Sequence, residues 1–248
     1  MNTTIVRGDT MRTWRIAILL AMLLCCSVSA LAEVPEYTVK RATGRIVLDG
    51  LLDEEDWAAA APAGEFQFPW WTSGDKEQTE VKLLWDDTFL YLAFRCDDKH
   101  IWADHYNINS STYEDDCVEM FWNPNPENSS DYYMFEINCI GVPKSLRRSD
   151  RITVMLPYIT QSIQGTVNND SDTDTQWIME IAVRFDEYTE LFSGEAPEPG
   201  AVWRIGLNRC GGKISPQYSQ WSPSHTASPN FHQPDDFGRI VFSGEAVR

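Results

Sequence analysis

The sequence predicts an all-β protein, built as a single antiparallel β-sandwich with one short helix near the N-terminus. Three observations support this prediction. Apolar and polar residues alternate with period two over many short runs, as in strands that bury one face. Turn-forming residues separate these runs. Only one segment has the pattern of a helix, and neither an internal repeat nor a Gly/Ser-rich linker divides the chain.

The helix is predicted from the segment DEEDWAAAA, residues 53–61, which Pro62 follows. Asp53 is a suitable N-cap, because its carboxylate can accept hydrogen bonds from the free amide groups of the first turn. Pro62 would end the helix, since proline lacks the amide hydrogen that a continuing helix needs.

Strands are predicted from five runs in which large apolar residues recur at every second position. These runs are residues 81–85, 90–95, 133–139, 177–184 and 203–208. Asp86-Asp87 separates the first two runs, and Asn168-Asn169-Asp170 precedes the fourth. Many short strands with turns at such spacing are typical of a sandwich.

Residues 1–32 have the features of a secretory signal peptide. Arg12 and Arg15 precede an apolar run at 16–26, and Ala30-Leu31-Ala32 supplies the small residues that signal peptidase needs. We therefore expect cleavage after Ala32, a secreted or periplasmic location, and one mature domain at 33–248. The alternative is an N-terminal membrane helix that is retained, but the apolar run is short for that role.

The expected mature chain is strongly acidic. Removing residues 1–32 takes away three arginines and one aspartate, which leaves 17 basic and 36 acidic side chains and a net charge of about −19. Such a surface repels phosphate backbones and anionic lipids, so we expect no nucleic-acid partner and no membrane partner after cleavage. Neutral polymers, cations and basic proteins remain as partners, and nothing indicates an oligomeric state.

Four cysteines lie beyond the predicted cleavage site: Cys96, Cys117, Cys139 and Cys210. An even number in an oxidising compartment suggests two disulfides, for which three pairings exist. All four cysteines lie in predicted strands, so buried free thiols are the alternative.

The segment YEDDCVEMFW, residues 113–122, holds four carboxylates at the start of a predicted strand. Neighbouring carboxylates repel one another, so the segment is either an acidic turn entering a strand or a binding site. Other polar residues point to the non-core face of their strands and would share one surface if these strands are neighbours. They are Arg95, Glu119, Glu136, Asn138 and Asn208. An ordinary solvated outer face is the alternative for this set.

Calcium is the metal for which the sequence offers candidate ligands. The loop DSDTD at 170–174 has alternating carboxylates, but Thr175 and Ile181 replace the glycine and glutamate that an EF-hand requires. We therefore interpret this loop as an acidic hairpin connection. Structural calcium could still bind through oxygen ligands from several loops. The candidate ligands are Asp97, Asp98, Asp115 and Asp116, with Asp49 as a further one.

Motifs of enzymes are mostly missing: the chain has no Gly-x-Ser-x-Gly, no P-loop, no dinucleotide glycine pattern and no His-Glu-x-x-His. Two carboxylates can flank a glycosidic bond, and Asp116 with Glu119 is the pair to test for a glycoside hydrolase. Because 36 acidic residues are available, such a pair is expected by chance, so we do not favour catalysis.

Several segments, in order, give the chain a resemblance to a known family. They are IVLDGLLDE at 46–54, VKLLWDD at 81–87, DCVEMF at 116–121, FEIN at 135–138, GLNR at 206–209 and PDDFG at 234–238. With Trp57, Trp177 and Trp221, this order resembles the family 9 carbohydrate-binding modules. These belong to the wider DOMON-like group of sandwiches, whose folds are similar to jelly rolls.

The resemblance implies a secreted protein that binds plant-type polysaccharide or oligosaccharide, of the xylan or β-glucan class, without catalysis, in carbohydrate degradation. It implies that Tyr113 and Phe231 stand at two aromatic positions, usually tryptophan in the family, that clamp the end of a sugar chain. Glu119 and Asn138 match polar binding positions, Arg95 is a further candidate, and Glu136 stands where the family has an arginine. Calcium in such sandwiches is structural.

The wider DOMON-like group implies a different function as an alternative. Some of its members hold a b-type haem for electron transfer between a methionine and a histidine or lysine. Met134 and His232 are the pair in this sequence that could do so.

Overall fold

The computed structural model describes residue 1 and residues 34–248, except residues 126 and 129. The predicted signal peptide, apart from Met1, lies outside the described residues. Residues 34–248 form one compact unit. Within these described ranges, no helix has both the length and the apolar character needed to cross a membrane.

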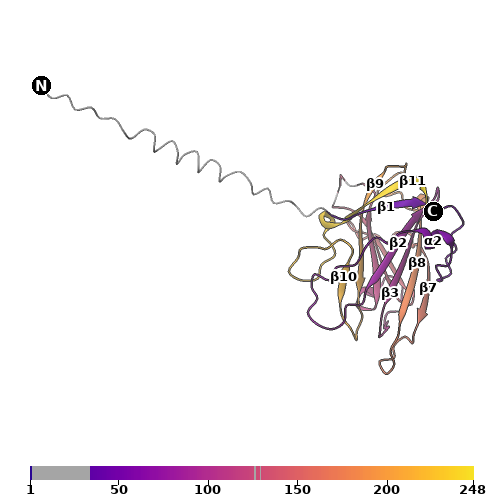
Figure 1. The fold of residues 1–248 in the computed structure, drawn as a ribbon, viewed down its shortest axis with the longest axis vertical. Coiled ribbons are helices and arrows are strands. Elements are labelled where there is room, and N and C mark those ends of the chain that lie inside the picture. The colour runs from indigo at the N-terminus through magenta and orange to yellow at the C-terminus, as the bar shows by residue number, and fades with distance from the viewer. Residues whose placement is uncertain (2–33, 126, 129) are drawn as a thin grey trace. The chain divides into compact units, whose positions relative to one another are not determined.

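Eleven strands make up the described part of the fold, and they form one continuous sheet (Figure 1). They are β1 (Glu36–Arg41), β2 (Thr79–Trp85), β3 (Phe89–Asp97), β4 (Cys117–Asn123), β5 (Tyr133–Asn138), β6 (Pro143–Arg147), β7 (Tyr158–Gln164), β8 (Gln176–Arg184), β9 (Val202–Cys210), β10 (Tyr218–Gln220) and β11 (Gly238–Ala246). Single 3₁₀ turns are η1 (Thr112–Glu114), η2 (Phe185–Glu187) and η3 (Pro234–Asp236). The predicted all-β class is confirmed.

The order of the strands explains how one sheet makes a sandwich. One half runs β6-β5-β4-β9-β11, with β10 added beside β9, and the other runs β2-β3-β8-β7. Strand β1 joins the halves: residues 36–39 and, after a bulge, Arg41 pair with β11, while Lys40 and Arg41 pair with β2. Pairing is antiparallel throughout except at β1, which is parallel to both neighbours.

The main core lies between the two halves of the sheet. Trp85 and Phe242, from β2 and β11, have ring centroids 5.2 Å apart. Phe242 in turn contacts Trp203, which stacks on Trp122 at 5.2 Å. Alternate residues of each strand enter this core, as period-two patterning requires. Large aromatic side chains therefore fill the space and hold the halves together.

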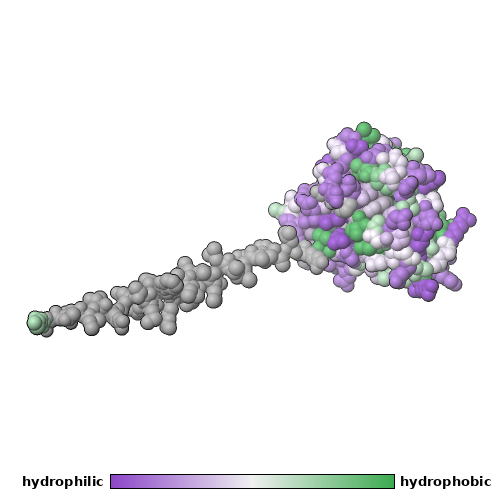
Figure 2. Space-filling model, turned by 90° about the horizontal axis from the view of Figure 1, so that it is seen from above, coloured by the Kyte–Doolittle hydropathy of each residue, from purple (hydrophilic) through white to green (hydrophobic). Residues whose placement is uncertain are grey.

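The outer surface is dominated by polar side chains. On the face shown in Figure 2, hydrophobic residues occur in small separate groups among hydrophilic ones. The one α-helix of the described residues, α2 (Glu55–Ala59), covers part of the outside of the fold. Its N-cap is Glu54 rather than the predicted Asp53, and neither that residue's side chain nor another one caps the helix. The helix ends three residues before Pro62.

All four cysteines of residues 34–248 are free and buried. The prediction of two disulfides is therefore wrong for this structure, and the alternative of buried thiols holds. The physical reason is burial of each thiol within a strand or at its end, where it packs as a small hydrophobe. Burial also raises the pKa of Cys96 to about 12, which suppresses the reactive thiolate.

This arrangement makes a testable prediction about thiol reactivity. The folded protein should resist alkylation by iodoacetamide at Cys96, Cys117, Cys139 and Cys210, because both access and thiolate formation are suppressed. After denaturation without a reductant, all four should be alkylated, as measured by peptide mass spectrometry. Protection of any pair in the denatured, unreduced sample would show a disulfide and contradict the prediction.

Candidate functional site

A row of polar side chains crosses four strands on the outer face of one half of the sheet. Directly opposed residues share a face, and the register places Asn208 beside Glu119, Glu119 beside Glu136, and Glu136 beside Lys144. Asn208 Nδ2 donates to Glu119 Oε2 at 3.3 Å, and Lys144 Nζ lies 2.8 Å from Glu136 Oε2. We refer to these four residues as the polar row.

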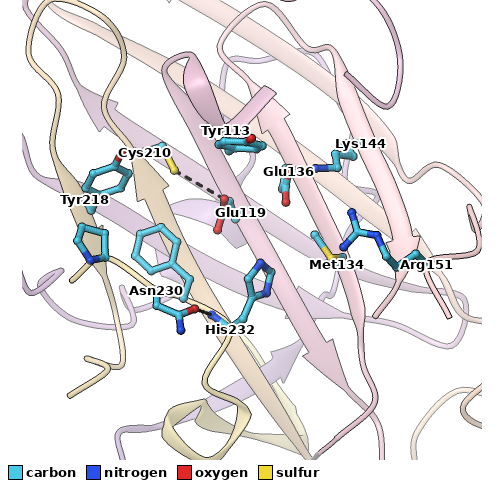
Figure 3. Close-up of a pocket in the computed structure, with 12 residues that line it drawn as sticks. Tyr113, Glu119, Met134, Glu136, Lys144, Arg151, Cys210, Tyr218, Asn230 and His232 are labelled. Atoms are coloured by element: carbon cyan, nitrogen blue, oxygen red, sulfur yellow. Dashed lines mark hydrogen bonds and ion pairs between the residues drawn. The ribbon is translucent and has the colours of Figure 1, made fainter. Parts of the chain in front are cut away.

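Three members of the polar row, Glu119, Glu136 and Lys144, form the floor of an open pocket of about 410 Å³ (Figure 3), and Asn208 contacts Glu119 beside it. Figure 3 shows Glu119 and Glu136 on the neighbouring strands β4 and β5, with Tyr113 at one end of the pocket and His232 and Asn230 at the other. The pocket is lined by Tyr113, Glu119, Met134, Glu136, Lys144, Arg151, Cys210, Tyr218, Pro229, Asn230, Phe231 and His232. These residues come from strands and loops that are distant in sequence.

Two exposed tyrosines lie at the mouth of the pocket. Tyr113 is 43% exposed on the 3₁₀ turn η1, and Tyr218 is 39% exposed on β10. Lys144 Nζ lies 5.0 Å from the centre of the Tyr113 ring. The predicted aromatic Phe231 also lines the pocket but is only 8% exposed, because Trp70 and Tyr218 pack against it. Tyr113 and Tyr218 therefore offer the larger free aromatic faces.

The two carboxylates at the floor have different protonation properties. Burial raises the pKa of Glu119 well above its ordinary value, and the neighbouring Glu136 raises it further. Burial also raises the pKa of Glu136, but Lys144 and Arg151 act against that rise. When the pair holds one proton, the proton therefore belongs on Glu119, while Glu136 stays ionised beside Lys144.

His232 is fixed in its position on the pocket wall. Its ring stacks on Phe121 with centroids 4.8 Å apart, and its Nδ1 is 2.9 Å from the Tyr132 hydroxyl. Burial lowers the pKa of His232 to about 4, and nearby cations contribute. The imidazole is therefore neutral near pH 7. Met134, the other residue of the haem alternative, lines the same pocket.

Two predicted binding residues lie outside this pocket. Asn138 is fully buried, and its amide donates to the His105 carbonyl and to Asp115 while its oxygen accepts from the Val142 amide. Arg95 belongs to β3 in the other half of the sheet, where it forms an ion pair with Glu80 at 3.0 Å. The expectation that Arg95 shares a surface with Glu119 and Glu136 is therefore wrong.

The four aspartates proposed for calcium do not converge on one point. Asp115 accepts from His105 Nδ1 and from Asn138, while Asp116 accepts from the Trp102 and Gly212 amides. Asp98 pairs with Arg209, whereas Asp97 is exposed. Across the described residues 34–248, no three His, Cys, Asp or Glu side chains are grouped as metal ligands would be. The residues therefore do not fit a calcium cage.

The loop at 170–174 has a structural role at its last residue. It joins β7 to β8, as the interpretation of an acidic hairpin connection requires. Asp174 is buried and accepts hydrogen bonds from the backbone amides of Ile101 and Thr166. The buried carboxylate thus ties the loop after β3, which carries Ile101, to the β7–β8 connection.

A second group of charges is buried beneath the surface, away from the polar row. Arg209 is fully buried and its Nη2 lies 2.9 Å from Asp98 Oδ2 and 3.8 Å from Glu77 Oε2. Its Nη1 donates to the carbonyls of Glu77 and Asp97. Burial raises the pKa of Asp116 to about 8, and the charge of Asp98 contributes. We refer to Arg209, Asp98, Glu77 and Asp116 as the buried charge cluster.

Sequence patterns did not assign six of the lining residues to a site: Lys144, Arg151, Cys210, Tyr218, Pro229 and Asn230. Lys144 and Tyr218 lie on the short strands β6 and β10, whose sequences lack a long apolar alternation. Arg151 and Asn230 lie in connecting segments. Lys144 stands opposite Glu136 in the register, so it brings a cation beside that carboxylate.

The comparisons with known proteins agree with this description. The model of carbohydrate-binding family 9 matches residues 48–242, which is most of the chain, and the protein therefore belongs to that family. No protein of curated function matches the sequence.

Solved structures share the fold at low sequence identity. A Bacteroides uniformis protein provisionally described as carbohydrate-binding has a TM-score of 0.68 and 19% identity, covering 85% of this chain and all of the other. A family 9 module of Caldicellulosiruptor kristjanssonii in complex with cellotriose has a TM-score of 0.61 and 16% identity, covering 85% and 95%. The module from the same organism in complex with glucose has a TM-score of 0.59 and 17% identity, covering 86% and 98%.

Proposed function

We propose that this protein binds the sugar units of a polysaccharide or oligosaccharide in the pocket above the polar row, without cleaving them. The observation that carries the proposal is the position of Tyr113 and Tyr218 beside a floor of charged and amide groups. A sugar ring has apolar C–H faces and hydroxyl edges, so aromatic faces and hydrogen-bonding groups together complement it. The ligands of the similar Caldicellulosiruptor module, cellotriose and glucose, support the xylan or β-glucan class.

We further propose that the protein acts outside the cytoplasm, in the breakdown of plant-type polysaccharide. The support is the charged, apolar and small-residue pattern of residues 1–32, which is typical of a cleaved secretory signal.

Binding of a small hydrated ligand in an open pocket favours affinities of roughly micromolar to millimolar Kd.

Hydrolysis is less compatible with the geometry than binding is. Asp116 and Glu119 do not flank a common space, because Asp116 is buried against the Trp102 and Gly212 amides while Glu119 faces the pocket. Glu119 and Glu136 lie side by side on one floor. A glycoside hydrolase instead needs its two carboxyl groups on either side of the scissile bond.

Haem binding is disfavoured by the polarity of the same floor. Met134 and His232 both line the pocket, as the alternative requires. However, an apolar macrocycle between them would lie over Glu119 and Glu136 and would further desolvate the ionised Glu136 and its partner Lys144.

The test uses isothermal titration calorimetry with cellotriose, xylotriose and mannotriose, and compares wild type with Tyr113→Ala and Tyr218→Ala. Each substitution should weaken binding of the preferred sugar about tenfold, since aromatic packing contributes about 0.5–1.5 kcal/mol beyond area burial. Tyr158→Ala is the matched control, because Tyr158 is 45% exposed and does not line the pocket.

Three results would decide between the functions. Binding that both pocket variants lose and the control keeps supports the proposal. Wild-type affinity in both pocket variants would contradict it. A Soret band after addition of haem, or release of reducing sugar from the trisaccharides, would favour electron transfer or hydrolysis instead.

A further inference from the structure

One wall of the pocket is basic, although the chain as a whole carries a formal charge of −17. Lys144 and Arg151 line the pocket. Arg148 lies close enough that, with these two, it helps to lower the pKa of His232, for which burial is the largest cause. We refer to Lys144, Arg148 and Arg151 as the cationic wall. Figure 3 shows Lys144 and Arg151 on the same side of the pocket.

The turn after β6 holds Arg151 in place. The Arg151 amide donates to the Arg147 carbonyl at 2.9 Å, and the Arg147 amide donates to the Ile152 carbonyl at 2.9 Å. Asp150 Oδ1 accepts from the Ile152 amide at 3.1 Å. Arg151 itself has a φ of 58°, in the left-handed region that non-glycine residues seldom adopt. The backbone thus fixes an arginine at a position where glycine or asparagine would be less strained.

Lys144 and Arg151 are the two cations of this wall that line the pocket, and among the described residues only Arg151 of these two has no contacting carboxylate. Lys144 contacts Glu136, and the nearby Arg147 pairs with Asp131 and Asp150. Among the described residues, Arg151 has no ion pair within 4.0 Å. Its guanidinium can therefore donate to a ligand without first breaking a salt bridge.

The charges at the floor do not cancel that of Arg151. Lys144 already balances Glu136, and burial favours the protonated form of Glu119 and the neutral form of His232. With Glu119 protonated, the lining keeps the positive charge of Arg151. A protonated Glu119 also becomes a hydrogen-bond donor toward the ligand.

His232 adds a polar ring on the pocket wall. Its Nδ1 lies 2.9 Å from the Tyr132 hydroxyl, so one nitrogen of the imidazole is already occupied by a hydrogen bond. Lys144 and Arg151 are the charged donors on the same pocket, and they lie on one side of it.

We propose, on the basis of the glycan-binding function above, that the pocket selects an acidic sugar unit whose anionic group is bound by Arg151 on the cationic wall. A uronic acid fits this arrangement, because its planar carboxylate matches the two parallel donors of a guanidinium. An amino sugar does not, since its ammonium would meet Lys144 and Arg151. A sulfated sugar carries the same charge on a tetrahedral group, so the experiment includes one for comparison with the uronic acids.

The experiment measures binding of matched sugars to the full protein by isothermal titration calorimetry at about 150 mM salt, where the Debye length is about 8 Å and long-range repulsion is screened. The pairs are glucuronic acid against glucose, and trigalacturonate against cellotriose. Glucose 6-sulfate and glucosamine are the further probes. We expect each uronate to bind at least about tenfold more tightly than its neutral partner.

Arg151→Gln should abolish this preference, so that the uronate and its neutral partner bind with similar affinity. Arg45→Gln is the matched control, because Arg45 is exposed and lies away from the pocket. The circular dichroism spectrum and melting temperature of Arg151→Gln show whether the turn is intact. Arg151→Lys, which keeps the charge but not the planar fork, should recover part of the preference.

The outcomes separate this inference from the proposed function. Equal binding of uronates and neutral sugars, or a preference unchanged in Arg151→Gln, would overturn the inference and leave glycan binding intact. Tighter binding of glucosamine than of glucose would also overturn it. Glucose 6-sulfate binding more tightly than glucuronic acid, with the gain lost in Arg151→Gln, would assign the site to sulfated sugars. Failure of every sugar to bind would overturn the proposed function as well.

Discussion

Replacing Arg209 by leucine will lower the free energy of unfolding by about 3–5 kcal/mol. Arg209 is fully buried, and it is the cation that contacts Asp98 and lies beside Glu77. Without it, these carboxylates remain buried with no compensating charge, and the Glu77 and Asp97 carbonyls lose their donor. The removal of one partner from a buried ion pair is costly for this reason. Urea unfolding at pH 7, followed by tryptophan fluorescence, measures the change.

A surface arginine provides the control for this prediction. Arg239 lies 3.5 Å from Glu36, and both side chains are about half exposed. Arg239→Leu should change stability by less than about 1 kcal/mol, because solvent screens an exposed pair. Adding Asp98→Asn to Arg209→Leu should restore part of the lost stability, since it removes one of the stranded charges. A loss below about 1 kcal/mol for Arg209→Leu would mean that water reaches the buried charge cluster.

The pH dependence of stability will change when Asp116 is replaced by asparagine. The pKa of Asp116 is about 8 in the folded protein, because of burial and the charge of Asp98, and about 3.9 is usual for an unfolded chain. Between these values the folded state holds a proton that the unfolded state has released. The free energy of unfolding contributed by this group therefore falls as pH rises from about 4 to about 8.

Asp116→Asn imitates the protonated side chain at every pH and removes this slope. Relative to wild type, the variant should gain stability as pH rises from about 4 to about 8, and the two curves should run parallel above that range. Chemical denaturation at a series of pH values gives both curves. The exposed Asp172→Asn serves as the control and should follow wild type. A variant that tracks wild type across the range would show that Asp116 is ionised at neutral pH in the folded protein.

Sequence patterns predicted the sandwich because alternation is a local property of each strand. The runs at 81–85 and 90–95 correspond to β2 and β3, and Asp86 accepts hydrogen bonds from the Thr88 and Phe89 amides in the turn between them. The parallel pairing of β1 was not predictable in this way. It depends on which strands meet at the edges of the two halves, and no local pattern records that choice.

The pocket could be predicted only in part, for the same physical reason. Alternation places Glu119 and Glu136 on the outer face of their strands, and the structure makes them direct neighbours. Asn138 lies two positions after Glu136 and so faces the same side of the strand, but the loop that carries His105 covers it. Arg95 also points outward, yet from the other half of the sheet. Alternation along a strand predicts which face of the sheet a residue occupies. The identity of the neighbouring strands, and of the loops that cover them, is decided by tertiary structure.

The polar row has a consequence for how the protein becomes functional during folding. Asn208 and Glu119 are 89 positions apart in the sequence, and they meet only when β9 pairs with β4. Closing so long a segment is slow compared with forming the β4–β5 hairpin, because chain entropy is lost before contacts are gained. We therefore expect the pocket to be complete only after β9 has paired with β4. A ligand of this pocket would stabilise only the completed topology by mass action.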